Sequence, residues 1–200
     1  MFTGIISDIG DITNQQKTVD GLKITVRKPA TWKDLKPGNS IAVNGVCLTA
    51  SAVRPGEFKC LIMPETLRKT TLGQGLPKKV NIERPLRADG EIGGHFVQGH
   101  IDGVGSVSQI SRKNGYRVSI EFPSKFKRLV VPKGSITIDG VSLTITTVKN
   151  NQLSVALVPF TLQNTTLGKL KVGDKVNLEF DMIAKQVAQI LKGRMARGEK

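Results

Sequence analysis

Two histidines in the segment GGHFVQGHIDG, His95 and His100, are the residues of this chain best suited to proton transfer. An imidazole with an ordinary pKa of ~6.5 can gain or lose a proton near neutral pH. A thiol in VNGVCLT (Cys47) and a hydroxyl in IDGVSLT (Ser142) can hydrogen-bond a ligand or attack it as nucleophiles. The combination suggests acid–base or covalent chemistry on a small bound molecule.

Cys47 and Ser142 occupy equivalent positions in an internal repeat. When the sequence is shifted by 95 residues, SIAVNGVCLTA (40–50) aligns with SITIDGVSLTI (135–145), and PETLRKTTLG (64–73) matches PFTLQNTTLG (159–168) at seven of ten positions. Identities that keep one offset over most of the chain indicate two copies of one module. We therefore expect a first module at residues 1–92, a second at 93–183, and a terminal helix with a basic tail at 184–200.

The positions at which the modules differ point to function rather than to folding. His100 aligns with Ile5, so the module can fold with an apolar residue there. Lys133 and Asp181 likewise align with uncharged residues, and Ser142 replaces the thiol of the first copy. Because these polar groups all lie in the second module, we expect both modules to bind similar molecules while the second carries out the chemistry.

Two candidates also have a purely structural interpretation. Cys47 is small enough to pack inside a barrel, where a free cysteine behaves as a small hydrophobic residue. His95 follows two glycines in ADGEIGGH (88–95), the only segment that could serve as a hinge between the modules. We expect His95 to have a structural role.

The hydrophobic pattern of each module is that of short strands. YRVSIEF (116–122) alternates apolar and polar residues, as half-buried strands do. Asn-Gly (44–45) and Asp-Gly (139–140) are favoured two-residue hairpin turns, since both central positions tolerate positive φ. Six or so such strands per module predict an all-β protein of two tandem closed barrels. Residues 30–38 and 124–134 are predicted to form single helical turns ended by proline.

One segment, IAKQVAQILKGRM (183–195), has a long helical pattern. Its apolar residues recur at steps of three and four, which gives the helix one apolar face. An amphipathic helix at a chain end needs an apolar partner, so we expect this helix to pack on another subunit. The residues of that face are Ile183, Val187, Ile190, Leu191 and Met195.

The chain of 200 residues carries a net charge of +14, which raises the question of an anionic partner. It has no block of five or six like charges, and its single tryptophan and single tyrosine offer little for base stacking. A solvated basic surface is therefore favoured over nucleic-acid binding. No apolar run approaches the ~18–20 residues of a membrane span, and MFTGI begins no secretory signal. Two cysteines without metal-ligand spacing predict a reduced, cytoplasmic protein. Since the sequence has no GxGxxG, Walker A, HExxH or CxxC motif, we expect neither a metal nor an organic cofactor.

Six segments together resemble the riboflavin synthase family (alpha-chain type) of the lumazine-protein superfamily: MFTGI, VNGVCLT, MPETLRKTTLG, IGGHFVQGHIDG, KGSITIDGVSLT and VNLEFD. The resemblance runs in order over essentially the whole chain. It implies two six-stranded Greek-key barrels and a homotrimer assembled around the C-terminal helix. It also implies a cofactor-independent transferase that dismutates two molecules of 6,7-dimethyl-8-ribityllumazine into riboflavin and 5-amino-6-ribitylaminouracil by moving a four-carbon unit. Lumazine synthase is a further implied partner.

The resemblance also implies a working site between the first barrel of one subunit and the second barrel of a neighbour. Its implied catalytic residues are His100, Ser142, Cys47 and Asp181. The implied first-barrel pocket is lined by Gly4, Ile5, Ile6, Ser40, Cys47, Leu48, Thr49, Leu61, Ile62, Met63, Pro64, Glu65 and Thr66. The implied second-barrel pocket is lined by Gly99, His100, Ile101, Lys133, Ser142, Leu143, Thr144, Leu157, Val158, Pro159, Phe160, Thr161 and Leu162.

Two positions depart from the family pattern. Leu61 stands where an acidic residue is expected, which removes a polar contact from that position. Phe160 stands where the first module has Glu65, and its ring could stack on a ligand or simply pack.

Two alternatives stay open beside the enzyme. A non-catalytic antenna protein of the same fold would hold one lumazine or flavin, and a basic barrel could bind nucleic acid. The polar set of the second module (His100, Lys133, Ser142 and Asp181) favours the enzyme over the antenna. The scarcity of aromatic residues counts against nucleic acid.

Overall fold

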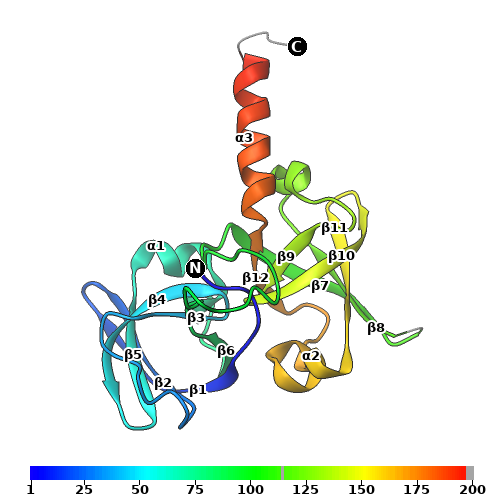
Figure 1. Cartoon of the computed structure of the whole chain (residues 1–200). Coiled ribbons are helices and arrows are strands. Elements are labelled where there is room, and N and C mark those ends of the chain that lie inside the picture. Colours follow the sequence, from blue (N-terminus) through cyan, green and yellow to red (C-terminus); the bar gives the residue numbers. More distant parts are fainter. Residues whose placement is uncertain (114, 197–200) are drawn as a thin grey trace.

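The computed structural model describes residues 1–113 and 115–196, and its strands form two closed antiparallel barrels (Figure 1). The first barrel closes in the order β1-β2-β5-β4-β3-β6. Its strands are β1 (Asp8–Thr18), β2 (Gly21–Arg27), β3 (Ser40–Val43), β4 (Val46–Arg54), β5 (Glu57–Ile62) and β6 (Lys79–Glu83).

The second barrel repeats this plan. It closes in the order β10-β11-β8-β7-β12-β9, the same cycle of neighbours shifted by one module. Its strands are β7 (Gly103–Ser111), β8 (Tyr116–Glu121), β9 (Ser135–Ile138), β10 (Val141–Lys149), β11 (Gln152–Leu157) and β12 (Lys175–Phe180). The all-β class and the two six-stranded barrels predicted from the repeat are confirmed.

Each barrel has its own apolar core, because alternate side chains of every strand point inward. Ile24, Ile41 and Phe58 are fully buried in the first barrel. Ile120, Ile136 and Leu153 are buried in the same way in the second. The buried residues of each core thus come from one module.

The two predicted hairpin turns form the seam between the barrels. Asn44 and Gly45 have φ of 44° and 77°, and Asp139 and Gly140 have φ of 46° and 82°, so each turn has the expected positive φ at both central residues. A Cβ on Gly45 would lie 2.7 Å from the backbone nitrogen of Gly140, and the reverse is also true. Glycine is therefore required at both positions, because the two turns touch backbone to backbone.

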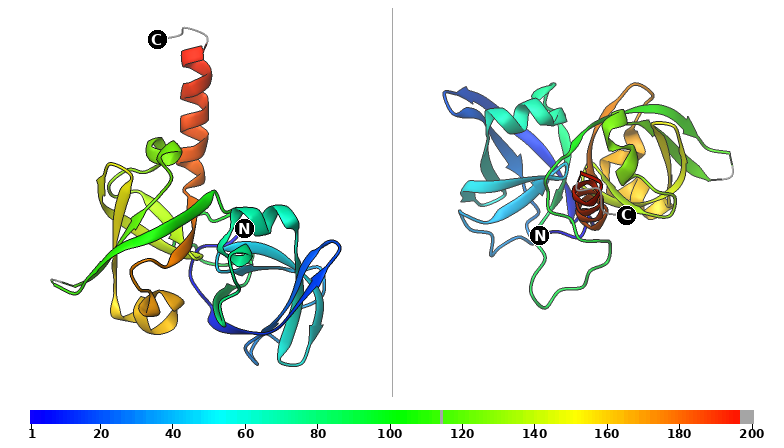
Figure 2. Two further views of the ribbon diagram at one scale, coloured as in Figure 1. Left: turned by 180° about the vertical axis from the view of Figure 1, so that it is seen from behind. Right: turned by 90° about the horizontal axis from the view of Figure 1, so that it is seen from above.

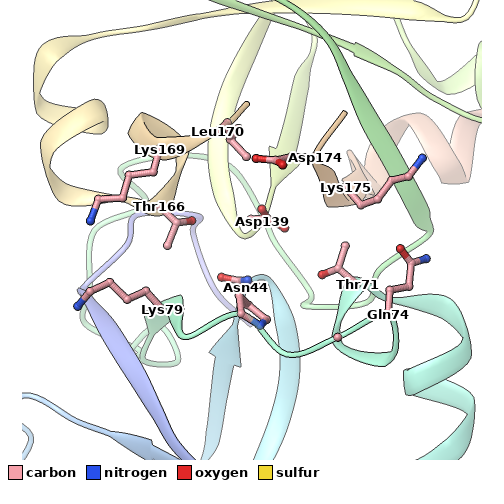
Figure 3. A pocket seen from close by; sticks show the side chains of 12 residues that line it. Asn44, Thr71, Gln74, Lys79, Asp139, Thr166, Lys169, Leu170, Asp174 and Lys175 are labelled. Atoms are coloured by element: carbon pink, nitrogen blue, oxygen red, sulfur yellow. The ribbon is translucent and has the colours of Figure 1, made fainter. Parts of the chain in front are cut away.

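Polar groups cross the seam in a two-fold pattern. The Asn177 side chain donates to the Asn44 carbonyl oxygen, and the Asn81 side chain donates to the Asp139 carbonyl oxygen, both at 2.9 Å. The side-chain oxygens of the same two asparagines accept hydrogen bonds from the backbone of the opposite module. Asn177 accepts from Thr71 and Asn81 from Thr166, both at 2.8 Å. These buried hydrogen bonds fix the barrels relative to each other. Figure 3 shows the cleft of about 390 Å³ above this seam, with the Asn44 and Asp139 side chains at its centre.

The helical segments differ in part from the prediction. No helix forms over 30–38, where the structure has turns instead, so that prediction is wrong. The predicted turn at 124–134 is present as the 3-10 helix η2 (Ser124–Leu129). Short helices that the strand pattern did not predict follow β5 and β11: α1 (Pro64–Lys69) and α2 (Pro159–Asn164), each continued by a 3-10 turn, η1 (Thr71–Gly73) and η3 (Thr166–Lys169).

The predicted C-terminal helix is present as α3 (Met182–Ala196), and it projects away from both barrels (Figures 1 and 2). Lys185 anchors its base by an ion pair of 3.0 Å with Asp102, which precedes β7. Ile183 and Ile190 on its apolar face are 61% and 62% exposed. No helix within the described ranges is long and apolar enough to cross a membrane.

Candidate functional site

The two segments that precede the barrels are exchanged between them. The backbone N–H of Ser142, in the second barrel, donates to the Gly4 carbonyl oxygen at 2.8 Å. The N–H of Cys47, in the first barrel, donates to the Gly99 carbonyl oxygen at 2.9 Å. Ile6 accordingly packs on the second core and Ile101 on the first. Each module therefore supplies its leading segment to the other module's barrel.

This exchange corrects the predicted grouping of the pocket residues. Gly4, Ile5 and Ile6 belong beside Ser142 of the second barrel, whereas they were assigned to the first. Residues 99–101 belong beside Cys47 of the first barrel, whereas they were assigned to the second. Sequence alignment places a segment within its module, but it does not say on which barrel that segment packs.

Two buried glutamates hold the exchanged segments in place. The Glu83 carboxylate, at the end of β6, accepts from the backbone of Thr3 (2.8 Å) and Gly4 (3.1 Å). The Glu179 carboxylate lies at the equivalent position in β12. It accepts from the backbone N–H groups of Gln98 (2.7 Å), Gly99 (2.9 Å) and His100 (3.0 Å). Burial raises the pKa of Glu83 to about 7, although these donors favour the charged form. Burial likewise raises the pKa of Glu179.

Sequence reasoning missed both glutamates. The available signal was that KVNIE (79–83) and KVNLE (175–179) end on the same acidic residue in both copies. An acid that both copies keep after an apolar residue at the end of this strand indicates a buried carboxylate with partners. Glu83 and Glu179 are 4% and 2% exposed, and their partners are the backbone of the pocket segments.

The strand register completes each pocket. Ala50 pairs with Cys60 across β4 and β5, so residues 47–49 and 61–63 continue from the same side of this pair. Ile145 pairs with Val155 across β10 and β11, so residues 142–144 and 156–158 do likewise. Helices α1 and α2 begin directly after these strands. That the linings 61–66 and 157–162 stand next to Cys47 and Ser142 respectively stays a prediction, which this register supports.

The predicted lining residues differ in their exposure. The buried ones are Gly4, Leu48, Ile62, Gly99 and Leu157. The exposed ones are Ile5, Thr49, Met63, Pro64, Glu65, His100, Lys133, Thr144, Val158, Pro159 and Phe160. The half-buried ones are Ile6, Ser40, Cys47, Leu61, Thr66, Ile101, Ser142, Leu143, Thr161 and Leu162.

Two of the exposed residues have a clear environment. Glu65 forms an ion pair of 2.7 Å with Lys69 along the surface of α1, so its carboxylate is engaged there. Phe160 is 72% exposed at the start of α2. A ring that is this exposed beside a pocket is available to stack on a planar ligand.

His95 contacts the predicted catalytic hydroxyl. Its Nδ1 lies 2.8 Å from the Ser142 Oγ, and its backbone N–H donates to the Thr3 carbonyl oxygen at 3.1 Å. Burial lowers the pKa of His95, and the charge of Asp181 partly opposes that shift. In one tautomer of the neutral ring Nδ1 accepts a hydrogen bond, and in that tautomer His95 can take the Ser142 proton. The prediction of a structural role for His95 stays a prediction beside this contact.

Asp181 has a structural task besides its charge. Its Oδ1 accepts from the Ile183 backbone N–H at 2.8 Å, which makes it the N-cap of α3. The same carboxylate thus caps α3 and raises the pKa of His95 through its charge. The four predicted catalytic residues are divided between two places: Ser142 and Asp181 lie near His95, while the segment of His100 lies on the strand of Cys47.

A family model, the lumazine binding domain, matches this chain twice, over residues 3–85 and 98–181. Riboflavin synthase of Mycobacterium bovis is 43% identical over 198 residues, covering 96% of this chain and 98% of that protein. Riboflavin synthase of Bacillus subtilis is 39% identical over 194 residues, covering 96% and 90%. Riboflavin synthase of Schizosaccharomyces pombe is 37% identical over 203 residues, covering 98% and 96%.

Solved structures share the fold. LumP complexed with 6,7-dimethyl-8-(1'-D-ribityl) lumazine superposes with a TM-score of 0.80 at 25% identity, covering 90% of this chain and 99% of that one. LumP complexed with riboflavin gives a TM-score of 0.80 at 27% identity over the same shares. LumP, which shares this fold, has thus been solved with a lumazine and with riboflavin bound.

Proposed function

This chain belongs to the riboflavin synthase family, and from that premise we propose that it converts two molecules of 6,7-dimethyl-8-ribityllumazine into riboflavin and 5-amino-6-ribitylaminouracil. The observation that carries the proposal is that one chain holds two equivalent sets of residues, around Cys47 and around Ser142, with different side chains in each. A reaction between two identical molecules needs two sites with different tasks. Holding both molecules in fixed orientation makes a bimolecular step effectively unimolecular.

The two pockets would divide the proton transfers. Riboflavin formation begins with loss of a proton from the C7 methyl group, whose carbanion delocalises into the electron-poor ring. His100, exposed on the segment beside Cys47, is the proposed base for this step. The Ser142–His95 pair is the proposed hydroxyl and proton acceptor of the other pocket. No metal or organic cofactor enters these steps, so turnover should survive dialysis against a chelator.

Assembly is the second part of the proposal. We propose a homotrimer in which α3 packs on its copies, and in which the first barrel of one subunit faces the second barrel of another. The apolar face of α3 borders a groove of about 660 Å³ whose other wall includes Leu129 and Val131 of the second barrel. Such a groove beside an exposed apolar helix supports a protein contact. Association with lumazine synthase and a cytoplasmic location belong to the proposal on the family resemblance.

The antenna protein is the alternative function. LumP complexes share the fold at 25% to 27% identity, whereas the synthases above reach 37% to 43%. The Ser142–His95 contact also supports chemistry rather than ligand storage, because a stored ligand needs no proton acceptor behind a hydroxyl. Both observations favour the enzyme.

A direct assay tests the proposal. The purified protein is incubated with 6,7-dimethyl-8-ribityllumazine, and riboflavin is detected by its fluorescence and by chromatography. Stoichiometric appearance of riboflavin and 5-amino-6-ribitylaminouracil is expected. Tight binding of the lumazine without any riboflavin would overturn the proposal and favour the antenna.

The base is tested separately through hydrogen exchange at the C7 methyl group in deuterated water. His100→Gln should slow this exchange along with turnover, while lumazine affinity changes much less. Unchanged methyl exchange in a variant that has lost turnover would place the base elsewhere.

A further inference from the structure

A strongly basic hollow lies at the end of the first barrel, apart from both lumazine pockets. It has a volume of about 620 Å³ and lies between the end of β2, the following loop and the β4–β5 turn. Four cationic side chains line it, and no acidic residue does: Arg27, Lys28, Lys33 and Arg54. A cleft lined by one sign of charge concentrates ligands of the opposite sign.

The hollow lies where the second barrel has a buried aromatic residue that the first barrel lacks. In the second barrel Phe122 donates its backbone N–H to Asn151 at 2.9 Å, and in the first barrel Lys28 makes the same 2.9 Å bond to Gly56. Lys28 and Phe122 therefore occupy equivalent places in the fold. Phe122 is 2% exposed and packs edge-on against Phe180, with ring centroids 6.2 Å apart.

The partner of that ring is replaced as well. Phe180 follows the buried Glu179, and the residue that follows Glu83 is Arg84. Arg84 turns to Asp34 in a two-bond ion pair of 2.8 Å and lies over the Trp32 ring. The second barrel thus shows that the fold accepts an apolar pair here, and folding alone does not require the cation at Lys28.

The cations of the hollow are largely free to bind a ligand. Lys28 Nζ donates to the Trp32 carbonyl oxygen at 2.8 Å, which fixes the ammonium in place and leaves two of its protons. Arg27 reaches Asp11 through one long contact of 3.4 Å, and Asp11 is bound more closely by Lys79 at 2.9 Å. Within the described residues, the side chains of Lys33 and Arg54 have no hydrogen bond or ion pair.

We propose that this hollow is a binding site for a phosphate-bearing small molecule of about nucleotide size. Arginine and lysine are the side chains that bind phosphate oxygens with short, charge-assisted hydrogen bonds. The volume falls within the ~300–1,000 Å³ of small-molecule sites. Val53 and Pro55 provide an apolar wall for the organic part of the ligand. This site is independent of the lumazine reaction, whose substrate carries no phosphate.

The test uses pyrophosphate and adenosine diphosphate as probes, titrated into the full-length protein by calorimetry at low ionic strength. Both should bind with one site per chain, and the diphosphate nucleoside more tightly because of the apolar wall. The variant Lys33→Gln/Arg54→Gln should weaken binding roughly tenfold or more, since it removes two charge-assisted contacts. Absence of measurable binding by the parent protein would overturn the proposal.

A matched control separates a built site from net charge. Lys127 and Lys149 hold the equivalent places in the second barrel, so Lys127→Gln/Lys149→Gln makes the same change in net charge. That variant should bind both probes within about twofold of the parent. The two charges that it removes lie on the second barrel, and they act on the hollow only through screened, long-range attraction. Equal weakening in the two double variants would show non-specific attraction and overturn the proposal.

Lys28→Phe provides a third arm, because it copies the residue of the second barrel. It should fill the hollow, abolish binding of both probes and leave riboflavin formation intact. If Lys28→Phe fails to fold, as judged by its thermal transition, the two double variants decide the question alone.

Discussion

Asp139→Asn should stabilise this protein at neutral and alkaline pH. Asp139 lies in the seam between the barrels and is 6% exposed, and burial raises its pKa from 3.8 to about 7. Its pseudo-symmetric partner is already an asparagine: Asn44 Oδ1 accepts from the Asn81 backbone at 2.7 Å, as Asp139 Oδ1 accepts from the Asn177 backbone at 2.8 Å. An amide at 139 keeps this hydrogen bond and tolerates the positive φ.

The magnitude follows from the raised pKa. A shift of about 3 units at ~1.36 kcal/mol per unit sets an upper limit of about 4 kcal/mol for the cost of ionising Asp139 in the folded state. The pKa of Asp139 is higher in the folded state than in the unfolded state. Below the unfolded value the carboxyl is protonated in both states, so the cost is absent there. It grows as the pH rises from 3.8 to about 7 and is constant above that. The charge of Asp174 adds to the shift, while the hydrogen bond from the Asn177 backbone opposes it. We therefore expect about 2–4 kcal/mol at pH 8.

Thermal unfolding of parent and variant at two pH values measures the effect. At ~2–4 °C per kcal/mol for a chain of this size, Asp139→Asn should unfold roughly 5–15 °C higher at pH 8 and at nearly the same temperature as the parent at pH 4. Asn44→Asp is the matched control, and it should lower the transition at pH 8 but not at pH 4. The reasoning is refuted if Asp139→Asn has no advantage at pH 8, or if its advantage is as large at pH 4.

Three further predictions concern the pockets and the assembly. In Glu179→Gln at least one backbone N–H of residues 98–100 faces the side-chain NH2 group instead of an oxygen, so the free energy of unfolding should fall by about 2–4 kcal/mol and kcat should fall as well. Unchanged thermal stability with full activity would contradict this role. Ser142→Ala should lower kcat by about 10²–10⁴-fold, whereas Cys47→Ser, which copies the other barrel, should keep appreciable activity in the riboflavin assay; equal losses would count against different tasks. Truncation after Asp181 should convert trimers to monomers in sedimentation and abolish turnover, and a truncated chain that stays trimeric would show that α3 is not the contact.

The barrels and turns could be predicted from the sequence because their signals are local. Alternating apolar residues and the Asn44-Gly45 and Asp139-Gly140 pairs specify strands and hairpins within a few residues, and the repeat offset then implies a second copy. The short helices α1 and α2 were missed because each is a single turn after a strand. The prediction of a helical turn over 30–38 was wrong for a similar reason, because a proline can end a helical turn or an irregular loop alike.

The role of His95 required the three-dimensional arrangement. Its environment depends on Ser142, which is 47 residues away along the chain. One local signal did exist in the preceding glycine. A Cβ on Gly94 would lie 2.8 Å from both the Cβ and the Oγ of Ser142, so this glycine marks a close approach of the segment to the site rather than a flexible hinge.

The exchange of the leading segments changes where the chemistry is expected. Viewed along the sequence, the polar differences lie in the second module, which suggested one working barrel and one binding barrel. In space, the segment of His100 lies on the first barrel beside Cys47, while Ser142 and His95 lie in the second. Neither pocket can be complete without backbone from the other module, because Gly99 binds Cys47 and Gly4 binds Ser142. A duplicated barrel joined in this way builds each set of residues from both copies, and its two halves are free to acquire different residues for different steps of one reaction.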